Sequence, residues 1–148
     1  MYSNKYIYLL LLLFFLSCKK GEKKEYPAEP SIEFISITPS SMTEGQSKII
    51  ISFKYSDGDG DLGENNPDVN NLFVTDNRLG ITYSYRIKQL TPTNSVIPIT
   101  GTLNTETGTV FISDGSAQQT VNFSLYIVDR AGHASNTITT SPVTIIAQ

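Results

Sequence analysis

The chain has 148 residues, with 11 lysine and arginine side chains against 14 aspartate and glutamate side chains, and a formal net charge of −3. This charge excludes a nucleic-acid-binding protein that works by bulk positive charge. With one cysteine and one histidine, the chain has no intrachain disulfide, no cysteine-rich zinc site and no catalytic centre built from several histidines. The first thirty residues lack the pattern of a folded domain, so about 118 residues remain for one hydrophobic core.

The N-terminal segment reads as a signal peptide. Residues 7–16 are an unbroken apolar run that follows Lys5. A helix that spans a bilayer needs about 20 apolar residues, whereas a shorter run behind a positive charge is typical of a signal peptide. A short buried helix with a core cysteine is the alternative. Phe15-Leu16-Ser17-Cys18 resembles the lipobox of bacterial lipoproteins, with Phe15 in place of the usual leucine. The resemblance implies that residues 1–17 are removed and that Cys18 is acylated.

Residues 18–30 are predicted to be the lipidated Cys18 and a charged, solvated linker. The segment 19–30, KKGEKKEYPAEP, combines four lysines and three glutamates with two prolines and shows no apolar periodicity. It lacks the aspartate next to the cysteine that resembles an inner-membrane retention signal in enteric bacteria. The resemblance therefore implies an outer-membrane destination, with the membrane as partner through the lipid. The acidic cluster associated with surface export in Bacteroidota-type bacteria is poorly matched, so a periplasmic or a surface orientation stays open.

Residues 31–148 are predicted to form short strands separated by turns. Three runs alternate apolar and polar residues, at 49–55, 81–88 and 121–128, and weaker runs occupy 32–38, 95–99, 109–112 and 137–146. No stretch shows helical periodicity with caps. Seven strands at this spacing predict an all-β fold, a single seven-stranded antiparallel β-sandwich. Pro142 lies inside the last run, which predicts an edge strand or a bulge there.

Two short motifs resemble bacterial immunoglobulin-like, fibronectin III-like and cadherin-like sandwich domains. One is Thr38-Pro39-Ser40-Ser41 with Gly45 after the first strand. The other is the segment 128–136, VDRAGHASN, which looks like the turn between the last two strands of such domains. His133 stands where asparagine is commoner. The resemblance implies an immunoglobulin-like sandwich, and the Cys–Trp–Cys pattern of antibody domains is absent.

The strongest chemical signal is the acidic loop, residues 57–68. It contains five carboxylates and no basic residue: Asp57, Asp59, Asp61, Glu64 and Asp68. Neighbouring carboxylates repel each other by about 1 kcal/mol per close pair even in water, so a fold that clusters them usually needs a cation. Ca²⁺ takes about six to eight oxygen ligands at flexible geometry. The loop glycines also allow it to wrap inward. The sequence therefore predicts a structural Ca²⁺ site, and the alternative is a solvated acidic turn, because Asp-Gly is a favoured turn pair.

The spacing of the acidic loop differs from that of an EF-hand. An EF-hand loop starting at Asp57 would have glycine at its sixth position and glutamate at its twelfth, where this chain has Leu62 and Asp68. The segment looks more like the aspartate-rich calcium loops of thrombospondin-type repeats and cadherin-like domains. Alternate loops of a sandwich lie at the same end, so the turn that starts at Asp129 is predicted to lie beside the acidic loop. The cadherin-like resemblance implies that Asp129 contributes to Ca²⁺ binding, and the alternative is that it caps its own turn.

Other residues carry weaker signals. His133 is predicted to be a turn residue rather than a base or metal ligand, and Arg78 is expected to pair with a nearby acid. Four tyrosines are interpreted mainly as core, with a sugar-stacking platform as the alternative: Tyr55, Tyr83, Tyr85 and Tyr126. Neither a nucleophile-elbow nor a phosphate-binding glycine motif is present.

These observations predict a lipid-anchored envelope protein that is not an enzyme and whose β-sandwich binds Ca²⁺. The first alternative is a glycan-binding accessory surface lipoprotein of a polysaccharide-uptake system. A weaker third alternative is an enzyme or enzyme inhibitor that uses the loop-rich end. An envelope protein or a glycan is the expected type of partner, and nucleic acid is not.

Overall fold

The structure is a computed structural model that describes residues 26–148, and this part of the chain is all-β. It contains ten strands in three sheets and no helix. Within the same residues there is consequently no helix able to cross a membrane. The predicted signal peptide, Cys18 and the lysine-rich part of the linker lie outside the described residues.

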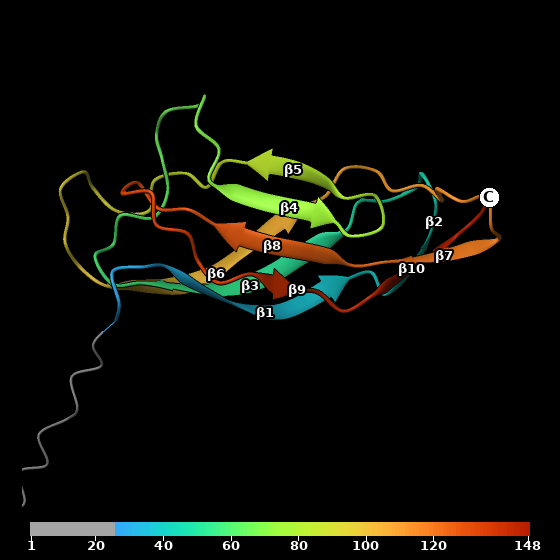
Figure 1. Ribbon diagram of the computed structural model, residues 1–148, viewed down its shortest axis with the longest axis horizontal. Coiled ribbons are helices and arrows are strands. Elements are labelled where there is room, and N and C mark those ends of the chain that lie inside the picture. The colour runs from blue at the N-terminus through green and yellow to red at the C-terminus, as the bar shows by residue number, and fades with distance from the viewer. Residues whose placement is uncertain (1–25) are drawn as a thin grey trace, which may run out of the picture.

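Two of the sheets form layers that face each other (Figure 1). The first is antiparallel and has the order β1-β3-β6, made of β1 (Ser31–Thr38), β3 (Ile50–Asp57) and β6 (Ile99–Glu106). The second is also antiparallel and has the order β5-β4-β8-β9, made of β5 (Ile81–Tyr85), β4 (Leu72–Asp76), β8 (Phe123–Ile127) and β9 (Ile138–Thr139). This arrangement is compatible with a β-sandwich.

The third sheet lies at the end of the molecule that holds the C-terminus (Figure 1). Its order is β2-β10-β7, made of β2 (Ser41–Thr43), β10 (Val143–Ile146) and β7 (Gln118–Val121). Within it, β10 pairs antiparallel with β7 but parallel with β2. The expectation of a wholly antiparallel fold is therefore wrong for the β2–β10 pair.

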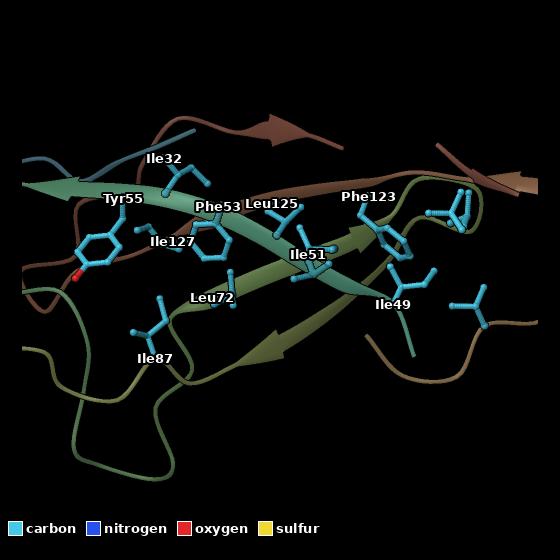
Figure 2. Packing of buried hydrophobic residues seen from close by; sticks show 14 of the residues in the cluster. Ile32, Ile49, Ile51, Phe53, Tyr55, Leu72, Ile87, Phe123, Leu125 and Ile127 are labelled. Atoms are coloured by element: carbon cyan, nitrogen blue, oxygen red, sulfur yellow. The ribbon is translucent and has the colours of Figure 1, made fainter. Parts of the chain in front are cut away.

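The hydrophobic core fills the space between the two facing layers (Figure 2). Strand β3 buries every second residue, with Ile51 and Phe53 fully buried. Strands β4 and β8 contribute the opposing side, where Val74 pairs with Leu125 and both are fully buried. Alternation of this kind is what a half-buried strand requires, because successive side chains point to opposite faces. Burial of the apolar side chains supplies the main driving force for folding.

Two of the weaker predicted strands are wrong. Residues 95–98 and 109–112 are not in strands, and the strand of this region, β6, lies between them. Its inward-facing positions include Gly101 and Thr105, so the apolar alternation that marks a strand is broken. Gly101 pairs with Tyr55, and a β-carbon at Gly101 would come within 2.8 Å of the Tyr55 hydroxyl oxygen. The tyrosine ring thus occupies the space that a side chain of β6 would fill.

The described residues contain ten strands instead of the seven expected, because two runs are split and because β2, β4 and β6 were not predicted. The run that ends in β8 is interrupted at Asn122, which separates β7 from β8. The last run divides into β9 and β10, and Pro142 lies between them. Strand β9 is an edge strand, whereas β10 is the central strand of its sheet. Strand β4 was not predicted, because it is short and shows only weak alternation in sequence.

Candidate metal centre

The acidic loop begins at a carboxylate buried at the end of β3. Asp57 follows Phe53 and Tyr55 on the inward face of the strand and has no exposed surface. Its Oδ2 atom accepts a hydrogen bond from the main-chain N–H of Leu62, at 2.8 Å. Its Oδ1 atom is buried and has no hydrogen-bond partner among the described residues. A buried carboxylate oxygen without a partner is costly, so this atom calls for a ligand that the described residues do not provide.

Three of the predicted ligands come together here. One carboxylate oxygen each from Asp57, Asp59 and Asp61 lies within 4.8 Å of the others. The Oδ1 atoms of all three residues are buried and lack a hydrogen-bond partner among the described residues. Carboxylate oxygens without donors, gathered at this separation, match the ligands of a hard divalent cation. The donor set therefore fits the Ca²⁺ that the sequence predicts.

The protonation behaviour of the group reflects its crowding and burial. Burial raises the pKa of Asp57 from 3.8 to about 6, the Leu62 N–H opposes this rise, and the neighbouring Asp59 and Asp61 add to it. Burial also raises the pKa of Asp61, with further contributions from the negative charges of Asp129 and Asp59. Without a cation, the site therefore holds its negative charge at a cost.

Close main-chain contacts hold the loop in place. Gly60 and Gly63 have positive φ angles of 74° and 90°, which favour glycine. A β-carbon at Gly60 would overlap the carbonyl group of Ile97, and one at Gly63 would overlap that of Lys88. The Thr91 hydroxyl also donates to the Gly60 carbonyl. The segment 88–97 therefore supports the loop from one side.

The entering chain lies against the same loop. A β-carbon at Gly58 would overlap the carbonyl oxygens of Tyr26 and Pro27, and Pro30 is buried. Among the described residues, contacts with the folded module thus begin at Tyr26, inside the segment predicted to be a solvated linker. Apart from the glycine at position 58, no local pattern in the sequence indicates this contact.

The predicted proximity of the acidic loop to the 129–133 turn is confirmed. The main-chain N–H of Ala131 donates to Asp61 Oδ2 at 3.0 Å. The Arg130 guanidinium donates to the Gly63 carbonyl at 2.8 Å. These two hydrogen bonds join loops that are far apart in the chain at one end of the molecule.

Asp129 lies beside the group of three aspartates but is not part of it. Its Oδ1 accepts the His133 main-chain N–H at 2.7 Å, and its Oδ2 lies 3.0 Å from His133 Nδ1. Both carboxylate oxygens are thus used within its own turn, as the capping alternative predicted. The Asp129 hydrogen bond and charge raise the pKa of His133. Asp129 affects the site through its charge, which acts on Asp61.

The two remaining predicted ligands also lie outside the group of three. Glu64 Oε1 accepts the main-chain N–H groups of Asn65 and Asn66, at 2.7 and 2.9 Å. Asp68 is exposed.

The residue that sequence reasoning undervalued is Leu62, whose side chain is fully buried. An apolar residue at the position where an EF-hand has glycine was the one sequence feature that indicated this burial.

The tyrosines do not form one platform. Tyr55 is in the core, and Tyr126 stacks on Phe73 with ring centroids 4.8 Å apart. Tyr83 and Tyr85 lie on β5, where Tyr83 remains exposed.

The expected pairing of Arg78 is confirmed, with its guanidinium 2.7 Å from the buried Asp76 carboxylate.

Comparison with known proteins adds no assignment. A scan against protein-family models matches none of them, and a search of the curated proteins finds no match.

Proposed function

We propose that this chain is a lipid-anchored protein of the bacterial cell envelope, without enzymatic activity, whose immunoglobulin-like module binds Ca²⁺ in the acidic loop. The signal-peptide pattern and the junction Ser17-Cys18 support a lipid on Cys18. The observation that carries the calcium part is the buried, unpartnered Oδ1 of Asp57, within 4.8 Å of the oxygens of Asp59 and Asp61.

Calcium is the cation that suits this group best. All three side chains offer carboxylate oxygen, the ligand type that hard cations prefer. The only histidine, His133, already pairs with Asp129, so it does not add a nitrogen ligand. Ca²⁺ tolerates irregular geometry, whereas Mg²⁺ requires a near-octahedral arrangement and keeps several waters. A loop with three clustered carboxylates on an irregular main-chain path therefore favours Ca²⁺.

The role of the ion would be to stiffen one end of the module. Its charge would offset the repulsion among the three carboxylates and hold the loop in its inward conformation. The hydrogen bond from Ala131 to Asp61 would transmit that order to the 129–133 turn. Extracellular modules bind Ca²⁺ with dissociation constants of about 10⁻⁴–10⁻³ M, which suits permanent loading outside the cell.

Thermal unfolding of the full chain in a non-ionic detergent tests the calcium site. Free Ca²⁺ at about 100 times its dissociation constant adds about 2.7 kcal/mol to the free energy of unfolding. The Asp59→Asn variant is expected to lose this gain. The Asp68→Asn variant removes the same charge from an exposed residue outside the group and is expected to keep it. An unchanged midpoint for the wild type at several millimolar Ca²⁺ would refute the site.

The anchor is tested separately. Expressed in a bacterium with a lipoprotein pathway, the wild type is expected in the membrane fraction, with a mass that shows acylation at Cys18. The Cys18→Ser variant is expected to leave the membrane fraction while retaining the Ca²⁺ response. Membrane association of that variant equal to wild type would contradict the lipid anchor.

A further inference from the structure

A cleft opens between the free edges of the two facing sheets. Strand β5 is the outermost strand of one sheet and β6 of the other, and residues of both line a cavity of about 680 Å³. Leu72, Ile87 and Leu103 give the cavity apolar walls. Tyr83 and Tyr85 also line it, from the face of β5 that is turned toward the other sheet. The cavity can therefore accept apolar side chains next to a strand edge.

The edge of β5 is free and regular. Among the described residues, β5 pairs only with β4, in unbroken register from Ile81 to Tyr85. The carbonyl of Tyr85 accepts the Asn71 N–H, so it faces the β4 side. Because main-chain groups alternate in direction along a strand, those of Thr82 and Ser84 face outward. The strand carries none of the lysines, prolines or bulges that usually protect an edge.

The charge of the cleft is opposite to that of the rest of the module. Of the six basic residues in 31–148, three line the cleft, namely Lys48, Arg86 and Lys88, whereas Glu106 is the only one of the eleven acidic residues to do so. The cleft lining thus carries 3 − 1 = +2, while the segment as a whole carries 6 − 11 = −5. Lys48 is paired with Glu106 at 2.9 Å, which leaves the surplus on Arg86 and Lys88. This surplus favours an acidic occupant and disfavours the same edge of a second copy.

We propose that the free edge of β5 binds an extended acidic peptide segment of a partner protein as an added strand. The main-chain groups of Thr82 and Ser84 would hydrogen-bond to the peptide. Alternate apolar side chains of the peptide would enter the cleft beside Tyr83, and its carboxylates would meet Arg86 and Lys88. In this mode of recognition, main-chain hydrogen bonds supply affinity and pockets for alternate side chains supply specificity. The proposal goes beyond the calcium site and does not depend on it.

Fluorescence anisotropy on the full chain in a non-ionic detergent tests the added strand. The probe is a labelled, terminally blocked eight-residue peptide that alternates valine and glutamate. Saturable binding is expected, and a valine–lysine peptide is expected to bind at least tenfold more weakly. The measurement is made once with calcium and once with a chelator. The peptide is expected to bind in both conditions, so the outcome does not depend on whether the proposed metal site binds Ca²⁺.

Two matched variants test the main-chain contact. Ser84→Pro removes the outward N–H without removing a hydrogen bond to β4, a position where an edge strand tolerates proline. It is expected to weaken binding at least tenfold. Ser84→Ala loses the same side-chain hydroxyl, which accepts from Asn70, but keeps the N–H, so it is expected to bind like the wild type. Equal binding by both variants would overturn strand addition.

A charge-matched pair tests the acidic preference. Lys88→Glu is expected to weaken binding at low ionic strength. Lys54→Glu, the same change on the exposed face of β3, is expected to have little effect. Absence of saturable peptide binding would overturn the proposal. It would also be overturned if an acidic oligosaccharide such as oligogalacturonate bound in place of the peptide. A dimer with β5 protected from hydrogen exchange would show that a second copy is the occupant.

Discussion

Leu62 is joined to Asp57 by a 2.8 Å hydrogen bond from its main-chain N–H to Oδ2, while its own side chain is fully buried. One residue thus anchors the acidic loop in the core and satisfies one oxygen of its most buried carboxylate. The other oxygen of Asp57 stays free for a ligand. Leu62 therefore links the hydrophobic core to the candidate metal centre.

Leu62→Ala tests this coupling. Removal of a fully buried leucine side chain costs about 2–5 kcal/mol of stability, and the loop loses its anchor. We expect a lower urea midpoint and a weaker response to Ca²⁺. Leu79→Ala, at a residue that is 46% exposed, is the matched control and should change neither by much. A normal Ca²⁺ response in Leu62→Ala would show that the anchor does not shape the site.

The pH dependence of stability has a definite sign. The pKa of Asp57 is about 6 in the folded protein against an ordinary value of 3.8, so between these values the folded state binds more protons than the unfolded state. Metal-free protein is therefore expected to lose stability as the pH rises from about 4 through 6. The raised pKa of His133 acts in the same direction, because its stabilising contribution is lost as the pH rises through that pKa.

At the proposed site calcium should reverse this trend, because a cation binds carboxylates in their ionised form. Urea unfolding at pH 5 and pH 7.5 is expected to show a large Ca²⁺ effect only at the higher pH. In Asp57→Asn, both the pH-dependent loss attributed to this residue and the Ca²⁺ gain should diminish. Metal-free wild type that gains stability between pH 5 and pH 7 would contradict the assignment.

The buried ion pair between Arg78 and Asp76, at the end of β4, is expected to contribute strongly to stability. The two side chains are only 10% and 5% exposed, and Arg78 Nη2 lies 2.7 Å from Asp76 Oδ2. Arg78→Met leaves a buried carboxylate without its counter-charge and should cost about 3–5 kcal/mol in urea unfolding. Lys48→Met breaks an exposed pair with Glu106, which solvent screens, and should change the urea midpoint little. Similar losses in the two variants would mean that burial does not set the strength of the pair.

Gly58→Ala tests the contact between the entering chain and the loop. An added methyl group would overlap the carbonyl oxygens of Tyr26 and Pro27, so one of the two segments must move. Faster hydrogen exchange and faster proteolysis are expected at residues 26–30. Gly108→Ala is the control, because a β-carbon there meets no atom within 4 Å and the residue has no positive φ. Unchanged exchange at 26–30 in Gly58→Ala would argue against the contact.

The parts of the fold that were predictable are those whose apolar alternation is strong. Strands β3 and β8 follow directly from residues such as Phe53 and Leu125, whose neighbours are polar. Strand β6 was missed because its inner face includes Gly101, which lacks an apolar side chain. A glycine is required there because the Tyr55 ring of β3 occupies the space of a side chain. Such a reason is a tertiary contact and leaves no local pattern.

The candidate site was predictable to a similar degree. The spacing of Asp57, Asp59 and Asp61 identified the group that converges. Glu64 has a similar charge and lies in the same loop, yet its carboxylate accepts two N–H groups of the next residues instead. Local hydrogen bonds that compete for a carboxylate depend on the exact path of the main chain, and composition does not reveal that path.

The contact of Tyr26 and Pro27 with Gly58 also bears on how the molecule would stand on a membrane. The chain enters the module at the end that holds the acidic loop, and the C-terminus lies at the opposite end (Figure 1). With a lipid on Cys18, eight residues at about 3.3 Å each allow a reach of at most about 26 Å from the anchor to Tyr26. The end that holds the acidic loop would then face the bilayer, where anionic headgroups concentrate divalent ions. The sheet that holds β2, β7 and β10 would point away from the membrane.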